Sequence, residues 1–88
     1  MKAFLHIYPN ETDKLREFQL LQETNIGATF NQQNTTAEYN GVLVLFISID
    51  EVVKLPNIRI ESVAYHNVEP DEATELMLMR RMNENCMY

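Results

Sequence analysis

The side chains best suited to acid–base or metal chemistry in this sequence are its two histidines, His6 and His66. Each falls on or at the end of a segment with the alternating pattern of a β-strand, so the two rings would meet if these strands are neighbours. With Glu61 or Cys86 they would supply metal-ligating atoms. They lack the short paired spacing of structural zinc sites and metallohydrolases, so no metal site is predicted.

Nucleophilic catalysis and phosphate binding are not predicted either. Cys86, the single cysteine, lies near the C-terminus beside acidic residues, which disfavour a reactive thiolate. Neither Ser48 nor Ser62 stands in a nucleophile elbow, and neither Gly27 nor Gly41 opens a phosphate-binding loop. We therefore expect no catalytic residues and no cofactor.

Composition limits the classes of protein that remain. The 88 residues, 45% of them hydrophobic and 23% charged, suffice for one core, so residues 1–88 are expected to form a single domain. A net charge of −6 with scattered Lys and Arg disfavours binding to nucleic acid. The longest apolar run, Val42–Ile47, is too short to span a membrane, and the first residues lack a signal-peptide pattern. With one free thiol, a cytoplasmic location is expected.

Hydrophobic periodicity and capping signals predict the elements. A strand over residues 3–8 ends at Pro9, and a helix follows with Asn10 as its N-cap. A short strand over 28–32 and a polar turn precede Val42–Ile47, which is apolar on both faces and predicts a central strand. Ser48 and Glu51 form a capping box for a two-turn helix ending at Pro56. A strand over 58–65 and a helix from Pro70 to about Asn85 complete the chain.

This order, β-α-β-β-α-β-α, predicts an α+β fold of the ferredoxin-like split βαβ type with an added C-terminal helix. Only ten residues separate Ile47 from Ile58, which is close to the minimum for a parallel crossover. The alternative is therefore an antiparallel meander with the helices packed on one face.

The last helix presents more apolar surface than one core-facing stripe requires, and acidic residues gather at its start. Flexible methionines suit adaptable contact surfaces, so we expect part of this face to bind a partner or a second copy of the chain. The predicted partner-binding residues are Glu69, Asp71, Glu72, Glu75, Leu76, Met79 and Met82.

The leading functional hypothesis is a small acidic, non-enzymatic protein-binding module, a regulator or inhibitor of another protein that acts as a monomer or as a homodimer. Small acidic chains of this type occur among phage and mobile-element inhibitors of host factors, and DNA mimicry by ordered carboxylates is a special case. The alternative is a small-molecule-binding or enzymatic domain with a cleft lined by His6, Tyr8, Glu61 and His66. Convergence of the two histidines with a carboxylate in a concave pocket would favour this alternative.

Overall fold

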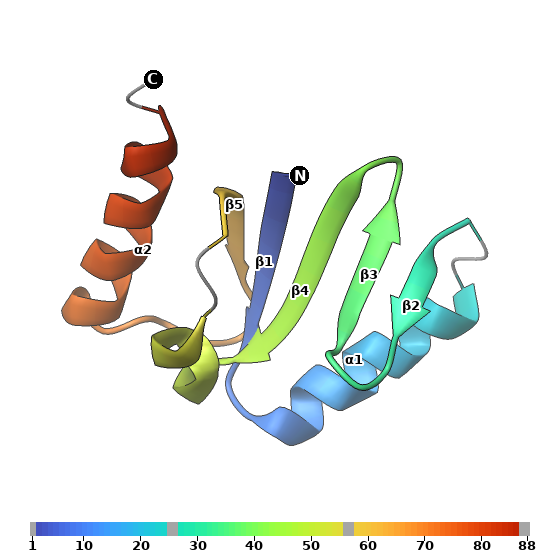
Figure 1. Cartoon of the computed structure of the whole chain (residues 1–88). Coiled ribbons are helices and arrows are strands. Elements are labelled where there is room, and N and C mark those ends of the chain that lie inside the picture. Colours follow the sequence, from blue (N-terminus) through green and yellow to red (C-terminus); the bar gives the residue numbers. More distant parts are fainter. Residues whose placement is uncertain (1, 25–26, 56–57, 87–88) are drawn as a thin grey trace.

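A mixed five-stranded sheet in the order β2-β3-β4-β1-β5 forms the centre of the protein (Figure 1). The computed structural model describes residues 2–24, 27–55 and 58–86, and only the backbone of residues 83–86. The elements are β1 (Lys2–Tyr8), α1 (Glu11–Thr24), β2 (Thr29–Asn31), β3 (Thr36–Tyr39), β4 (Val42–Ser48), the 3₁₀-helix η1 (Ile49–Lys54), β5 (Ile60–Tyr65) and α2 (Glu72–Cys86).

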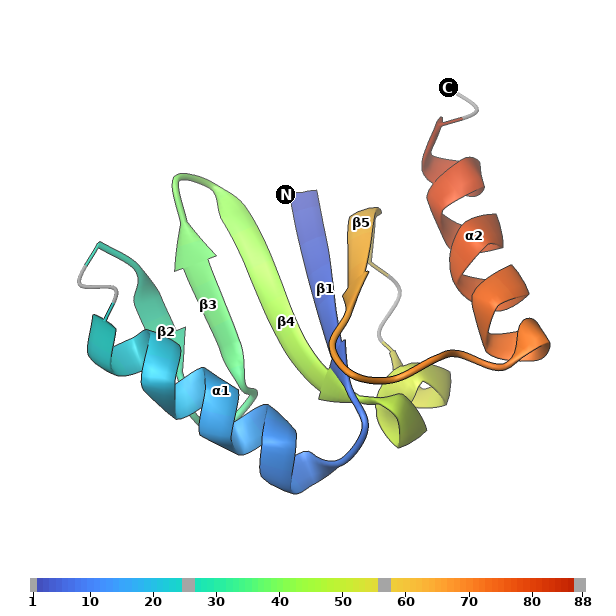
Figure 2. The same ribbon diagram turned by 180° about the vertical axis from the view of Figure 1, so that it is seen from behind.

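Helices cover both faces of this sheet. Helix α1 lies across β2, β3 and β4, whereas α2 stands beyond β5 (Figure 2). On β1, Leu5 and Ile7 point into a core that includes Val52 of η1 and Leu78 of α2. The next residue, Tyr8, packs on the opposite face in a second core that α1 supplies with Phe18. Both β1 and β4 contribute buried residues to the two cores, which confirms that Val42–Ile47 is a central strand covered on both sides.

A β-hairpin that the sequence analysis did not predict joins β3 to β4. The two strands pair antiparallel, and the residues between them, Asn40 and Gly41, both have positive φ angles of 50° and 78°. These angles characterise the type I′ turn, for which Asn-Gly is the preferred dipeptide. The Asn40-Gly41 dipeptide is therefore a hairpin signal that the sequence analysis did not use.

The predicted ferredoxin-like topology is wrong, although the α+β class is confirmed. Strands β2, β3 and β4 form an antiparallel meander, but β4 and β5 both pair parallel with β1, which lies between them. The alternative of a meander with helices on one face is therefore also wrong. The connection from β4 to β5 passes over β1, and a 3₁₀-helix suits it because it rises about 2.0 Å per residue against 1.5 Å in an α-helix.

Capping fixes the helix starts. The Asp13 amide donates to Asn10 Oδ1 at 2.8 Å, which confirms Asn10 as the N-cap of α1. For α2, the Thr74 amide donates to Asp71 Oδ1 at 2.7 Å, so this helix begins at Glu72 and not at Pro70. None of the described helices is long and apolar enough to cross a membrane.

Candidate functional site

His6 and His66 meet on the α1 side of the sheet. His6 lies on β1, and His66 follows β5, where its amide donates to the Ile7 carbonyl at 2.8 Å and continues the ladder. Alternation along the two neighbouring strands then places both imidazoles on one face. His6 Nδ1 and His66 Nε2 are 2.7 Å apart, which is hydrogen-bonding distance.

The two rings form this bond edge to edge. Their planes differ by 16° and their centroids are 4.9 Å apart. The centroids are farther apart than the two bonded nitrogens by about the width of one imidazole ring, so both nitrogens lie close to the line that joins the centroids. The shared proton therefore lies near the plane of both rings. The bond leaves His6 Nε2 and His66 Nδ1 as the outer nitrogens of the pair.

Aromatic rings surround the pair. Tyr8 lies parallel to His66 with centroids 4.6 Å apart, and Phe46 packs against His6 at 5.5 Å. Burial and the adjacent His66 lower the pKa of His6 below its ordinary value of 6.5, although the charge of Glu17 opposes this shift. His6 is therefore neutral near pH 7.

The charge of Glu17 on α1 acts on both His6 and Tyr8. Together with burial, its charge raises the pKa of Tyr8 to about 12, so the phenol stays protonated. The Tyr8 hydroxyl is buried and has no hydrogen-bond partner among the described residues. A polar cavity of about 150 Å³ opens at this point, lined by Tyr8, Pro9, Asp13, Arg16, Glu17, His66 and Asn67.

A larger and mostly apolar cavity of about 530 Å³ lies on the other side of the pair. It falls between α1 and the sheet, and His6 is its most basic lining side chain. The remaining lining residues are Leu21, Thr24, Gly27, Ala28, Phe30, Ala37, Tyr39, Val44 and Phe46. A mostly apolar cavity of this volume with a few polar side chains in its lining has the usual character of a small-molecule site. His6 therefore borders the apolar cavity, while its hydrogen-bonded partner His66 borders the polar one.

The opposite face of the sheet carries a groove of different chemistry. Its volume is about 450 Å³, and it is lined by Leu43, Leu45, Ile47, Leu55 and Ile58 together with Asn34, Thr36, Glu51 and Lys54. Its only carboxylate, Glu51, is already engaged in a structural ion pair. The other ionisable side chain in this lining is Lys54, so the groove has neither an imidazole nor an available carboxylate.

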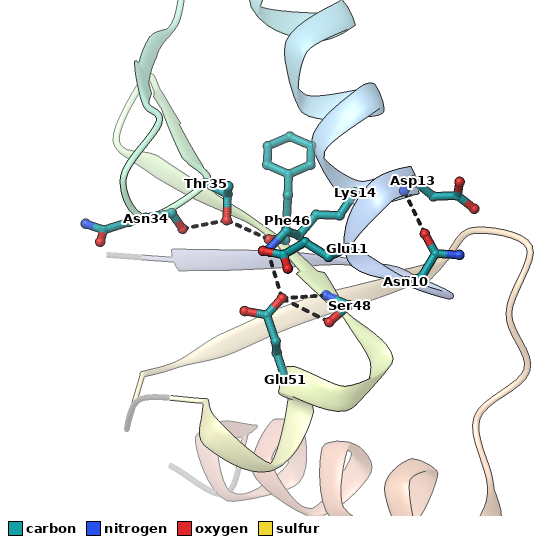
Figure 3. A network of polar contacts seen from close by, with 9 residues as sticks. All are labelled: Asn10, Glu11, Asp13, Lys14, Asn34, Thr35, Phe46, Ser48 and Glu51. Atoms are coloured by element: carbon teal, nitrogen blue, oxygen red, sulfur yellow. Dashed lines mark hydrogen bonds and ion pairs between the residues drawn. The ribbon is translucent and has the colours of Figure 1, made fainter.

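That ion pair attaches α1 to η1 around the end of β4 (Figure 3). Lys14, whose side chain is only 4% exposed, donates through Nζ to Glu51 Oε1 at 2.8 Å. The same oxygen accepts from the Ser48 amide and hydroxyl, which confirms the predicted pairing of Ser48 with Glu51. Desolvation alone would raise the pKa of Glu51, but the hydrogen bonds from Lys14 and Ser48 outweigh it and lower that pKa.

Thr35 fixes the backbone at Phe46, one wall of the apolar cavity. Its carbonyl accepts from the Phe46 amide at 3.0 Å, and its hydroxyl lies 3.0 Å from the Phe46 carbonyl (Figure 3). Thr35 adopts a left-handed φ of 49°, which is rare for a β-branched residue. These two contacts hold the residue in that conformation.

The predicted partner-binding residues of α2 divide between two environments. Leu76 and Met79 are 55% and 50% exposed, whereas Met82 is half-buried against the core around Leu78. Asp71 caps the helix, and its hydrogen bonds with Thr74 lower its pKa. Glu69, Asp71, Glu72 and Glu75 are all exposed. The apolar face is thus partly core and partly open surface.

The sequence pointed to His6, Tyr8 and His66 at this site, but not to Glu17. Glu61 does not join them, because it pairs with Arg59 at 3.6 Å near the start of β5. Glu17 takes that place, and its position between Arg16 and the buried Phe18 on a helix gave no signal. Within the described part of the chain, no group of three His, Cys, Asp or Glu residues could hold a metal ion. The side chain of Cys86 lies outside the described residues.

Comparison of the chain with protein families, with curated proteins and with solved structures finds no significant match. We therefore infer the function from the geometry of the site.

Proposed function

We propose that this protein binds a small, flat, mostly apolar molecule with one hydrogen-bonding group in the cavity between α1 and the sheet. The observation that carries this proposal is the position of His6. It borders a largely apolar cavity of about 530 Å³ and is oriented there by a 2.7 Å hydrogen bond from its other nitrogen to His66. A neutral imidazole in an apolar wall both anchors and orients a ligand, because it can donate or accept one hydrogen bond.

The lining explains the expected shape of the ligand. Phe30, Tyr39 and Phe46 supply aromatic surface, and Ala28 and Ala37 leave room beside it. Aromatic side chains favour planar ligands, which stack on them or meet their edges. No charged side chain lines this cavity, so a neutral molecule is favoured over an ion.

Filling the cavity should weaken binding. We expect an Ala37→Leu variant to lose at least about tenfold in affinity for the best aromatic compounds of a fragment library, because the added atoms occupy the ligand volume. Ala73→Leu, the same substitution at an exposed position of α2, is the matched control and should bind normally. Binding is measured by amide chemical shifts. If no aromatic fragment shifts the signals of the lining residues, or if both variants bind alike, the proposal is wrong.

Protein binding through α2 is the second candidate, and the exposure of Leu76 and Met79 supports it. They lie three residues apart on the outer side of the helix, with Glu72 and Glu75 beside them. An apolar centre with an acidic margin fits a partner with an apolar surface and a basic margin. The regulatory or inhibitory role, the homodimer and the non-enzymatic character expected from the sequence remain proposals of this second candidate.

A variant carrying Leu76→Asp and Met79→Asp should remove such an interaction by at least about a hundredfold without unfolding the protein, because neither side chain is in the core. Met82 is left unchanged because it packs against the core. Affinity capture and light scattering of both proteins test this prediction. An unchanged set of partners and an unchanged molecular mass would contradict it.

A further inference from the structure

We propose that His6 and His66 form a proton relay that lets a weakly acidic ligand, such as a phenol, lose its proton while it stays in the apolar cavity. This inference rests on the proposed ligand site and adds the chemical class of the ligand and the path of its proton. The observation behind this proposal is the position of the pair between two cavities. The two ends of one hydrogen-bonded histidine pair border two different cavities, one mostly apolar and one polar.

The number of protons makes the two ends of the pair interdependent. When both imidazoles are neutral, the pair carries two N–H protons, and one of them lies between His6 Nδ1 and His66 Nε2. The other must then lie on one of the outer nitrogens. If it is on His66 Nδ1, then His6 Nε2 is an acceptor towards the apolar cavity. If it is on His6 Nε2, then His66 Nδ1 is an acceptor towards the polar cavity.

The charged groups around the polar cavity favour the first arrangement. Glu17 and Asp13 place carboxylates there. Asp13 is paired with Arg16 at 3.5 Å, so among the described residues Glu17 supplies the negative charge of this lining that no ion pair offsets. Negative charge beside His66 favours a proton on its outer nitrogen. Tyr8 faces the same cavity but stays protonated, since burial and Glu17 raise its pKa to about 12. His6 Nε2 is then an acceptor for a ligand O–H, on a side chain that lines the apolar cavity.

The transfer balances without a cofactor. The ligand O–H bond breaks and its proton goes to His6 Nε2, while the proton on His6 Nδ1 moves to His66 Nε2. The proton on His66 Nδ1 leaves to water or hydroxide in the polar cavity. The ligand remains as its anion, hydrogen-bonded to the new His6 N–H. Neither imidazole carries a net charge at the end, so burial of His6 does not oppose the step. The anion itself is disfavoured in a lining without charged groups, so the ligand ionises at a higher pH in the cavity than in water.

Stopped-flow absorbance with a nitrophenol that occupies the cavity tests the relay, because its colour reports its ionisation. After a pH jump, ionisation in the wild-type protein should be faster than ligand dissociation, which is measured by displacement with the corresponding methyl ether. In a His66→Gln variant the side-chain amide can still hydrogen-bond to His6. It cannot accept a proton from His6 and release a different proton to the polar cavity. Ionisation should there slow by about a hundredfold or fall to the dissociation rate. Binding of the methyl ether should not change.

Each outcome decides a different point. Normal binding of both compounds with equal ionisation rates in the two proteins would overturn the relay and leave the ligand site intact. Failure of both compounds and of all other aromatic fragments to bind would overturn the ligand site itself. If His66→Gln does not fold, nitrogen-15 spectra of the wild-type histidines give the answer. His66 Nδ1 should change between protonated and unprotonated signals when a phenol is replaced by its methyl ether, and an unresponsive His66 would overturn the relay.

Discussion

Replacing Glu51 with alanine is expected to lower the free energy of unfolding by about 2–3 kcal/mol, as measured by urea denaturation. The physical reason lies in Lys14, whose side chain is 4% exposed and whose ammonium would lose its 2.8 Å partner. A buried charge without a partner is costly, and Glu11, 3.7 Å from the same nitrogen on an exposed side chain, replaces that partner poorly. The variant also removes the acceptor for the Ser48 amide and hydroxyl.

The reverse substitution should be much milder. A Lys14→Met variant leaves Glu51 half-exposed and able to hydrate, and methionine fills a similar volume, so its stability should stay within about 1 kcal/mol of wild type. Equal and large losses in the two variants would contradict this asymmetry and would show that the pair acts as one cooperative unit.

Acid should remove the contribution of Glu51. Its pKa in the folded protein lies below the ordinary value of 4.5, so the stability it supplies is complete above that value. This contribution is lost as the pH falls towards the lower pKa of the folded state. The difference in unfolding free energy between wild type and Glu51→Ala should therefore shrink below about pH 4.5. A difference that stays constant on acidification would show that ionised Glu51 is not the source of the effect.

Replacing Leu78 with alanine should cost about 3 kcal/mol, because this side chain is 1% exposed and inserts α2 into the core around Leu5 and Ile7. Helix α2 follows a long connection from β5, and its other core contacts come from half-buried methionines. Truncation of Leu78 therefore removes the best-buried contact between this helix and the sheet. Urea denaturation measures the change in unfolding free energy. Faster amide hydrogen exchange in α2 than in β1 would show that the stability is lost mainly at this helix.

Leu76 is the matched control on the same helix. Its side chain is 55% exposed, so Leu76→Ala should change the free energy of unfolding by less than about 0.5 kcal/mol. Equal losses at the two positions would mean that Leu76 is covered in solution, which would support burial of the outer face of α2 by a second copy of the chain.

Local signals in the sequence were sufficient wherever the structure depends on neighbouring residues. Asn10 caps α1, and Ser48 with Glu51 marks the start of η1, because caps satisfy backbone groups within three residues. Val42–Ile47 is apolar on both faces and does occupy the centre of the sheet. The Asn40-Gly41 dipeptide also contained enough information to predict the β3–β4 hairpin.

The order of the strands, and with it the candidate site, was decided only by the tertiary structure. An alternating strand can pair in either direction, parallel or antiparallel, so the insertion of β1 between β4 and β5 follows from how all the apolar faces are covered together. That insertion brings His66 to His6 and lets Glu17 of α1 replace Glu61 beside them. The sequence by itself determined that the two histidines lie on or beside strands and that a carboxylate would be available. Which side chains meet was determined only by packing between segments that lie up to 60 residues apart in the sequence.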